Sequence, residues 1–200
     1  MIAEIKEFSK IFLEKTQDKK IQIISHFDTD GISSAAILSK TLERLYKQFS
    51  LKILKQLGSE EIALFPKDKI LLILDLGSGS MNYLSELKND IFIIDHHEIS
   101  DKNIPDNIHI LNPHLLENYE NLCTAEICYL LSTSISEENK NLSYLAILGM
   151  IGDTMEKEIN KTRDRIIKEA DITIKRGVLI YPSTRPLDKT LEYSARPFIP

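Results

Sequence analysis

The chain has 200 residues, of which 42% are apolar and 28% charged, so it is long enough for one globular domain with a substantial core. Its formal net charge of −5 argues against a protein that grips nucleic acid along an extended basic track. It has no apolar run of about 18 residues, the length a membrane span needs, and charged residues at positions 4, 6 and 7 interrupt any signal peptide. We therefore expect a cytoplasmic protein with no membrane partner.

Apolar periodicity predicts helices and strands in alternation. Helices are expected over residues 2–17, 31–49, 80–87, 124–131 and 139–150. Strands are expected over residues 21–24, 51–54, 70–74, 91–94 and 108–111. Because the strands are continuous apolar runs, we predict an α/β fold, a doubly wound and mainly parallel sheet with helices on both faces. We expect this domain over residues 1–176, followed by a proline-punctuated connector over residues 177–200 that leads toward a second domain.

Carboxylates and imidazoles follow several of these apolar segments. Because the carboxyl ends of parallel strands gather at one edge of an open sheet, where ligands bind, we expect these side chains to converge on one site. The six strongest ligand candidates are His26, Asp28, Asp30, Asp75, His96 and Asp153.

Such a set of ligands suits Mn²⁺, Mg²⁺, Fe²⁺ or Zn²⁺, and the two cysteines have no metal-binding spacing. Without a metal, clustered carboxylates repel one another and some must hold protons. Two divalent cations about 3.5–4 Å apart, bridged by a carboxylate, would resolve this conflict and could activate water for attack on a phosphoester. We therefore expect phosphoester hydrolysis.

Neighbouring residues could assist this chemistry. His97 could contact the scissile phosphate or act as an acid, and Asp95 could support an imidazole from outside the ligand set. Gly31, at the start of the long helix, would leave backbone N–H groups free to meet an anion. His114, a loop residue after Asn112-Pro113, and Arg185 are weaker candidates for substrate contact. For Arg185, a solvated or salt-bridged arginine is the commoner case.

The order of these motifs resembles the DHH phosphoesterase superfamily, which includes RecJ exonucleases, oligonucleotide-degrading enzymes and family II pyrophosphatases. The resemblance covers nearly the whole chain and rests on His26-x-Asp28-x-Asp30-Gly31, Asp75, Asp95-His96-His97 and Gly152-Asp153. Residues 24–26, 75–79, 111–114 and 184–194 are further similar to the archaeal RecJ-like nuclease that associates with the GINS replication complex.

The resemblance implies two cations, most often Mn²⁺ with Mg²⁺ as the alternative, and exonucleolytic hydrolysis of single-stranded DNA or RNA. By that resemblance His97 faces the phosphate and Asp75 bridges the ions. One ion would bind His26, Asp28 and Asp75, and the other Asp30, Asp75, His96 and Asp153.

The resemblance also implies a substrate-binding domain with a glycine-rich motif, which these 200 residues lack. We expect a separate chain to supply it, unless the sequence is a cut piece, and GINS to be a further partner. Two alternatives stay open. One is hydrolysis of a small substrate, such as a short oligonucleotide, a nucleotide or pyrophosphate, which the acidity favours slightly. The other is a replisome adaptor that mainly binds GINS. Cleavage polarity is also open.

Overall fold

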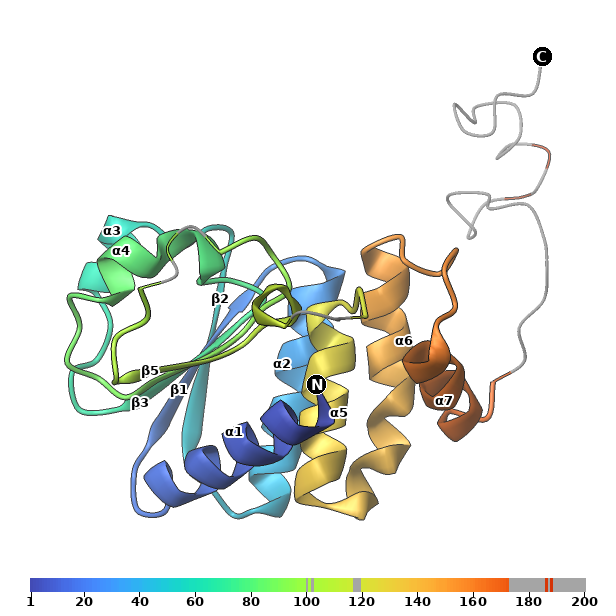
Figure 1. Cartoon of the computed structure of the whole chain (residues 1–200), viewed down its shortest axis with the longest axis horizontal. Helices are drawn as coiled ribbons and strands as arrows, with labels where there is room; N and C mark the ends of the chain where they lie inside the picture. Colours follow the sequence, from blue (N-terminus) through green and yellow to red (C-terminus); the bar gives the residue numbers. More distant parts are fainter. Residues whose placement is uncertain (100, 102, 117–119, 173–185, 187, 189–200) are drawn as a thin grey trace.

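The computed structural model describes residues 1–99, 101, 103–116, 120–172, 186 and 188 (Figure 1). Arg185 and most of the connector predicted over residues 177–200 lie outside the described residues. Within the described part of the chain, no helix has both the length and the apolar character needed to cross a bilayer.

One sheet of five parallel strands lies at the centre of the fold, in the order β2-β1-β3-β4-β5. The strands are β1 (Ile21–His26), β2 (Phe49–Leu54), β3 (Ile70–Leu74), β4 (Ile91–Ile94) and β5 (Ile108–Leu111). Every residue of β3 and β4 is buried, which explains why these strands are continuous apolar runs in the sequence. The predicted α/β fold with a mainly parallel sheet is confirmed.

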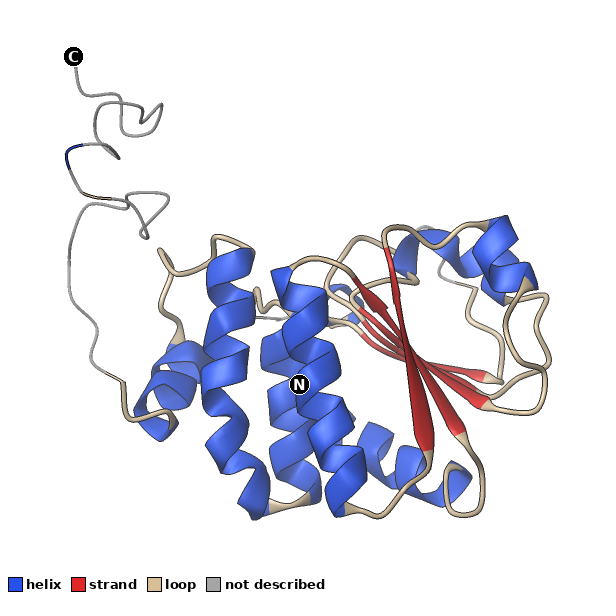
Figure 2. Ribbon diagram, turned by 180° about the vertical axis from the view of Figure 1, so that it is seen from behind, coloured by secondary structure: helices blue, strands red, loops and turns tan. Residues whose placement is uncertain are grey.

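The two faces of the sheet carry unequal helical layers (Figure 2). The longer helices are on one face: α1 (Ile2–Lys15), α2 (Thr29–Arg44), α5 (Thr124–Ile135), α6 (Ser143–Gly152) and α7 (Lys161–Glu169). The other face is covered by α3 (Ser59–Ala63) and α4 (Met81–Leu84). Three short 3₁₀ helices are η1 (Ser78–Ser80), η2 (Pro113–Leu115) and η3 (Glu137–Leu142). Along β3, Leu72 and Leu74 pack into the larger core, whereas Leu71 and Ile73 pack into the smaller one.

Some predicted boundaries are wrong. The helix predicted over residues 31–49 is α2, which ends at Arg44. It ends there because Tyr46 takes a left-handed backbone conformation, with a φ of 55°, and Phe49 already belongs to β2. The helix predicted over residues 139–150 divides into η3 and α6.

Helices α3 and α7 have no counterpart among the predicted elements. Helix α7 is polar except for Ile166 and Ile167, so apolar periodicity does not signal it. Its start has a different signal, because the side chain of Asn160 accepts a hydrogen bond from the N–H of Arg163 and caps the helix.

Candidate metal centre

The candidate ligands lie at the carboxyl edge of the sheet, beside a reversal in strand order. From the end of β1 the chain crosses to β2 on one side, while β3 is followed by β4 on the other side. In open α/β sheets, ligands bind at the carboxyl edge beside the point where connections leave in opposite directions. The fold thus places the segments after β1, β3 and β4 next to one another at this edge.

The first group of candidate ligands is formed by His26, Asp28 and Asp75. Nδ1 of His26 lies 2.7 Å from Oδ2 of Asp28 and 3.3 Å from Oδ2 of Asp75. The His26 nitrogen and this Asp75 oxygen are buried, and neither makes a hydrogen bond within the described residues. Leaving the buried Oδ2 of Asp75 without a hydrogen bond is costly, and imidazole nitrogen and carboxylate oxygen are both metal ligands. This group therefore fits a divalent cation.

The second group is formed by Asp30, His96 and Asp153. Nε2 of His96 lies 3.0 Å from Oδ2 of Asp153 and 3.9 Å from Oδ2 of Asp30. The same nitrogen lies 3.6 Å from Oδ1 of Asp75. Because Oδ2 of Asp75 faces His26 and Oδ1 faces His96, the two oxygens of one carboxylate meet the two groups.

Asp75 is held in an unusual conformation directly after β3. Its φ of 57° lies in the left-handed region, which aspartate tolerates better than most residues, and its side chain is only 1% exposed. Oδ1 accepts a hydrogen bond of 2.8 Å from the hydroxyl of Thr124. Burial, together with the carboxylates of Asp30 and Asp28, raises the pKa of Asp75 to about 10. Without a cation, therefore, Asp75 holds a proton at neutral pH.

Asp30 is anchored by the start of α5. Its oxygens accept hydrogen bonds of 2.8 Å from the backbone N–H groups of Thr124 and Ala125. A helix N-terminus favours a carboxylate, but burial outweighs these contacts and raises the pKa of Asp30. Thr124, which is not among the residues predicted for the site, therefore binds both Asp30 and Asp75.

Gly31 does not have the role expected for it. The helix begins at Thr29 and Asp28 caps it, because Oδ1 of Asp28 accepts the N–H of Gly31 at 2.9 Å. The expectation that this N–H is free to meet an anion is therefore wrong. A Cβ at Gly31 would lie 2.5 Å from the carbonyl oxygen of His26, so glycine is required for this close approach.

His97 is the most exposed member of the cluster, with its side chain 55% exposed. Its Nδ1 lies 2.7 Å from Oδ1 of Asp95, and this hydrogen bond raises the pKa of His97. Burial opposes ionisation of Asp95, but hydrogen bonds from His97 and from the N–H of Ser78 outweigh it and lower the Asp95 pKa. The imidazole that Asp95 contacts, as expected for a supporting residue, is thus that of His97. Asp75, His96 and His97 also lie close enough together to hold an ion.

Asn112, which sequence reasoning did not assign to the site, supports the segment that carries His97. Its side-chain amide donates to the carbonyl oxygen of His97 at 2.9 Å and to the hydroxyl of Ser78 at 3.0 Å. Its Oδ1 accepts the backbone N–H of His114. The structure thus places His114 in η2, beside this support, with an exposed side chain. Arg185 lies outside the described residues.

Comparison with known proteins identifies the family. The family model described as "DHH family, N-terminal domain" matches residues 20–152, which contain all the candidate metal ligands except Asp153. The chain belongs to the DHH family. Members of the DHH superfamily are metal-dependent phosphoesterases.

Related proteins are longer than this chain. An uncharacterized protein of Methanocaldococcus jannaschii is 30% identical over the full chain, which spans 49% of that protein. A crystal structure of the exonuclease RecJ bound to manganese is 20% identical and superposes with a TM-score of 0.70, covering 83% of this chain and 46% of RecJ. CDC45 from Entamoeba histolytica is 17% identical with a TM-score of 0.62, covering 84% of this chain and 37% of CDC45. These likenesses to solved structures show the shared fold, and the chain spans about half the length of the first two proteins.

Proposed function

We propose that this member of the DHH family hydrolyses phosphodiester bonds in single-stranded DNA or RNA from a strand end, with two divalent cations, preferably Mn²⁺. Asp75 is the observation that carries the proposal. Its buried carboxylate has one oxygen toward the group of His26 and Asp28 and the other toward His96. A carboxylate so placed is suited to bridge two ions, and two-metal sites are typical of phosphoryl transfer to water.

The residues present would divide the work between the two ions. His26, Asp28 and Asp75 would hold one ion, and Asp30, Asp75, His96 and Asp153 would hold the other. When bound, such a pair of cations supplies a water of lowered pKa and neutralises charge on the phosphoryl oxygens.

His97 is the candidate for contact with substrate. Asp95 engages Nδ1 and fixes the ring, so Nε2 is the atom that would face the phosphate or give a proton to the leaving oxygen. The amide of Asn112 holds the carbonyl of His97 and keeps this segment in place. Contacts with Asp95 and Asn112 therefore hold this exposed imidazole in place before any substrate binds.

One observation supports a nucleic-acid substrate. The sequence similarity to the archaeal RecJ-like nuclease includes residues 75–79 and 111–114, which the structure places around Asp75 and His97. The net charge of −5 instead favours a second candidate, a phosphoesterase for small substrates such as dinucleotides or pyrophosphate. Both candidates use the same metal centre and differ in what contacts the rest of the substrate.

Hydrolysis of 5′-labelled single-stranded DNA and RNA with Mn²⁺ tests the proposal. Protein with Asp75→Asn, purified in parallel, controls for contaminating nuclease. We expect a ladder of shortened products that disappears with the variant. Competition with an excess of dinucleotide or pyrophosphate then separates the candidates, because inhibition by these compounds together with slow cleavage of long strands would favour the small-substrate enzyme. Equal cleavage by the wild type and the variant would contradict both.

A further inference from the structure

A buried ion pair joins α7 to the start of α5. Arg163 of α7 and Glu126 of α5 each have side chains that are 1% exposed. Nε of Arg163 donates to Oε1 of Glu126 at 2.9 Å, and Nη2 donates to Oε2 at 3.0 Å. This two-pronged geometry fixes the orientation of both side chains.

The same two side chains also hold the backbone that leads into α5. Arg163 donates to the carbonyl oxygens of Asn121 at 2.6 Å and of Glu158 at 2.7 Å. Oε2 of Glu126 accepts the N–H of Cys123 at 2.9 Å and so caps the helix. The backbone immediately before and at the start of α5 is thus tied to α7 by the guanidinium and carboxylate groups.

The next two residues along the chain reach the metal centre. Thr124 and Ala125 donate their N–H groups to Asp30, and the hydroxyl of Thr124 donates to Asp75. We infer that Arg163 is a positioning residue, which acts through Glu126 and the start of α5 to orient the carboxylates of Asp30 and Asp75 for metal binding. This inference rests on the proposed two-metal function.

Stability alone gives a weak reason for this ion pair. Replacing a buried ion pair by well-packed apolar side chains is often neutral or stabilising, because removing two charges from water costs about as much as their attraction returns. Partners that orient metal ligands from outside the coordination shell typically change metal affinity by about 10–100-fold when they are removed. An orienting role therefore accounts for an arrangement that a stabilising role explains less well.

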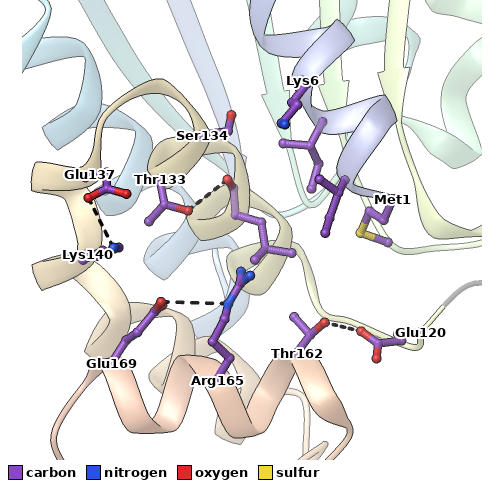
Figure 3. A pocket seen from close by; sticks show the side chains of 13 residues that line it. Met1, Lys6, Glu120, Thr133, Ser134, Glu137, Lys140, Thr162, Arg165 and Glu169 are labelled. Carbon is purple, nitrogen blue, oxygen red and sulfur yellow. Dashed lines mark hydrogen bonds and ion pairs between the residues drawn. The ribbon is translucent and has the colours of Figure 1, made fainter.

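Helix α7 borders a cavity, so its polar contacts contribute more to holding it in place than they would in a fully packed region. A cavity of about 740 Å³ lies between the start of α1 and α7, and Figure 3 shows Arg165 and Glu169 of α7 lining it. Elsewhere α7 is linked to α5 by the hydroxyl of Tyr129, which donates to Oε2 of Glu169 at 2.6 Å. This second link offers a matched control, since it joins the same two helices but does not contact the residues at the start of α5.

The test is Mn²⁺ binding by the protein with Arg163→Met and Glu126→Gln combined. Glutamine keeps an acceptor for the N–H of Cys123, and methionine keeps side-chain bulk without leaving a buried, unpaired charge. Calorimetric titration gives the affinities, and electron paramagnetic resonance shows whether two Mn²⁺ ions are coupled as a pair. We expect at least roughly 10-fold weaker binding of one ion and loss of the coupled spectrum, with Tyr129→Phe unchanged.

The outcomes separate the inference from the proposed function. If the wild type takes up no coupled pair of Mn²⁺ ions, the two-metal proposal fails first. If the wild type does so and the folded double variant binds both ions with unchanged affinity, the positioning role of Arg163 is wrong. A loss of affinity equal to that of Tyr129→Phe would also overturn it. Should the double variant not fold, Arg163→Lys, which keeps the charge but loses the fork, is titrated in its place with the same criteria.

Discussion

Oδ2 of Asp75 and Nδ1 of His26 lie 3.3 Å apart in the interior, and neither makes a hydrogen bond with any residue that the structure describes. Asp75 also has a left-handed backbone conformation, with a φ of 57°. An unsatisfied buried polar group costs about 1–3 kcal/mol and a strained backbone a similar amount, so the metal-free arrangement is expensive to maintain. Such costs are typical of functional sites, and a bound cation would remove the first of them.

Replacing Asp75 by asparagine should separate stability from function. Asparagine also tolerates the left-handed conformation, so the fold is expected to survive, and the buried carboxyl group is gone. We expect metal-free protein with Asp75→Asn to melt at the same temperature as the wild type or higher, while hydrolysis falls by at least about 10²-fold, because both ions lose a ligand. Thermal melts in chelator and a nuclease assay measure the two effects.

The control for this substitution is Asp90→Asn. Asp90 pairs with Lys15 at 3.0 Å and Lys19 at 2.8 Å, and these lysines lower its pKa. It lies just before β4, at the opposite end of that strand from His96. We expect Asp90→Asn to leave the rate of hydrolysis unchanged. A comparable loss of activity in both variants would point to general damage and not to the metal centre.

Removing divalent metal should lower the melting temperature of the wild type. A ligand that binds only the folded state, present at 100 times its dissociation constant, stabilises by about 2.7 kcal/mol. For a domain of this size that corresponds to a shift of roughly 5–10 °C. We therefore expect Mn²⁺ to raise the melting temperature over that in chelator by this amount, and expect no shift with Asp75→Asn. Equal shifts in both proteins would mean that the ion binds elsewhere.

That the candidate ligands lie close together could be predicted because the sequence places them after apolar segments. Asp75 and His96 follow apolar strands directly, and parallel strands have their carboxyl ends at one edge, so a linear pattern specifies a three-dimensional cluster. The groups that hold these ligands had no such signature. Thr124 contacts Asp30 across 94 positions of sequence, and this contact depends on how α5 packs against α2.

The unequal helical layers were also beyond the sequence pattern. A periodic signal needs a window of about 11–18 residues, and α3 has only five. The helix predicted over residues 80–87 is present as the four residues of α4 and is shorter than expected. Helix α7, with nine residues, is also shorter than this window and is polar, and its buried Arg163 has the appearance of a surface residue in the sequence. Burial of a charged side chain depends on a partner from elsewhere in the chain, here Glu126, which no local pattern reveals.

Alanine at Gly149 should damage the metal centre. A Cβ there would lie 2.4 Å from Cβ of Ala125 and 2.6 Å from Oδ1 of Asp30. In most helices this change gains about 1 kcal/mol of helix propensity, but overpacking of about 1–3 kcal/mol outweighs it here. We expect a lower melting temperature and weaker Mn²⁺ binding, measured by thermal melts and titration. Gly79→Ala, with no atom within 4 Å of the new Cβ, should change neither quantity, and equal effects would contradict the argument.

His109 should make the fold sensitive to acid. Its ring packs against Phe92 with centroids 4.8 Å apart, and burial, assisted by Lys15, lowers its pKa. Below about pH 6.5 the unfolded chain therefore binds a proton that the folded chain resists, so stability falls as the pH drops through this range. His109→Ile removes the titration. We expect the melting temperature of His109→Ile to increase relative to that of the wild type as the pH is lowered from 7.5 to 5. A difference in melting temperature that stays constant over this range would refute this role.

His97 should matter for turnover and not for metal binding. Loss of a group that transfers a proton or contacts the transition state typically costs about 10²–10⁴-fold in rate, so His97→Asn should lower kcat while two Mn²⁺ ions still bind. The opposite result is informative, because Nδ1 of His97 also lies 3.9 Å from Oδ1 of Asp75. If calorimetry shows weaker Mn²⁺ binding by His97→Asn, this imidazole is a ligand. Asp95→Asn tests whether Asp95 orients the His97 ring for catalysis. If it does, this variant should show the same loss in kcat as His97→Asn, because the 2.7 Å contact between Asp95 and His97 holds the imidazole in place.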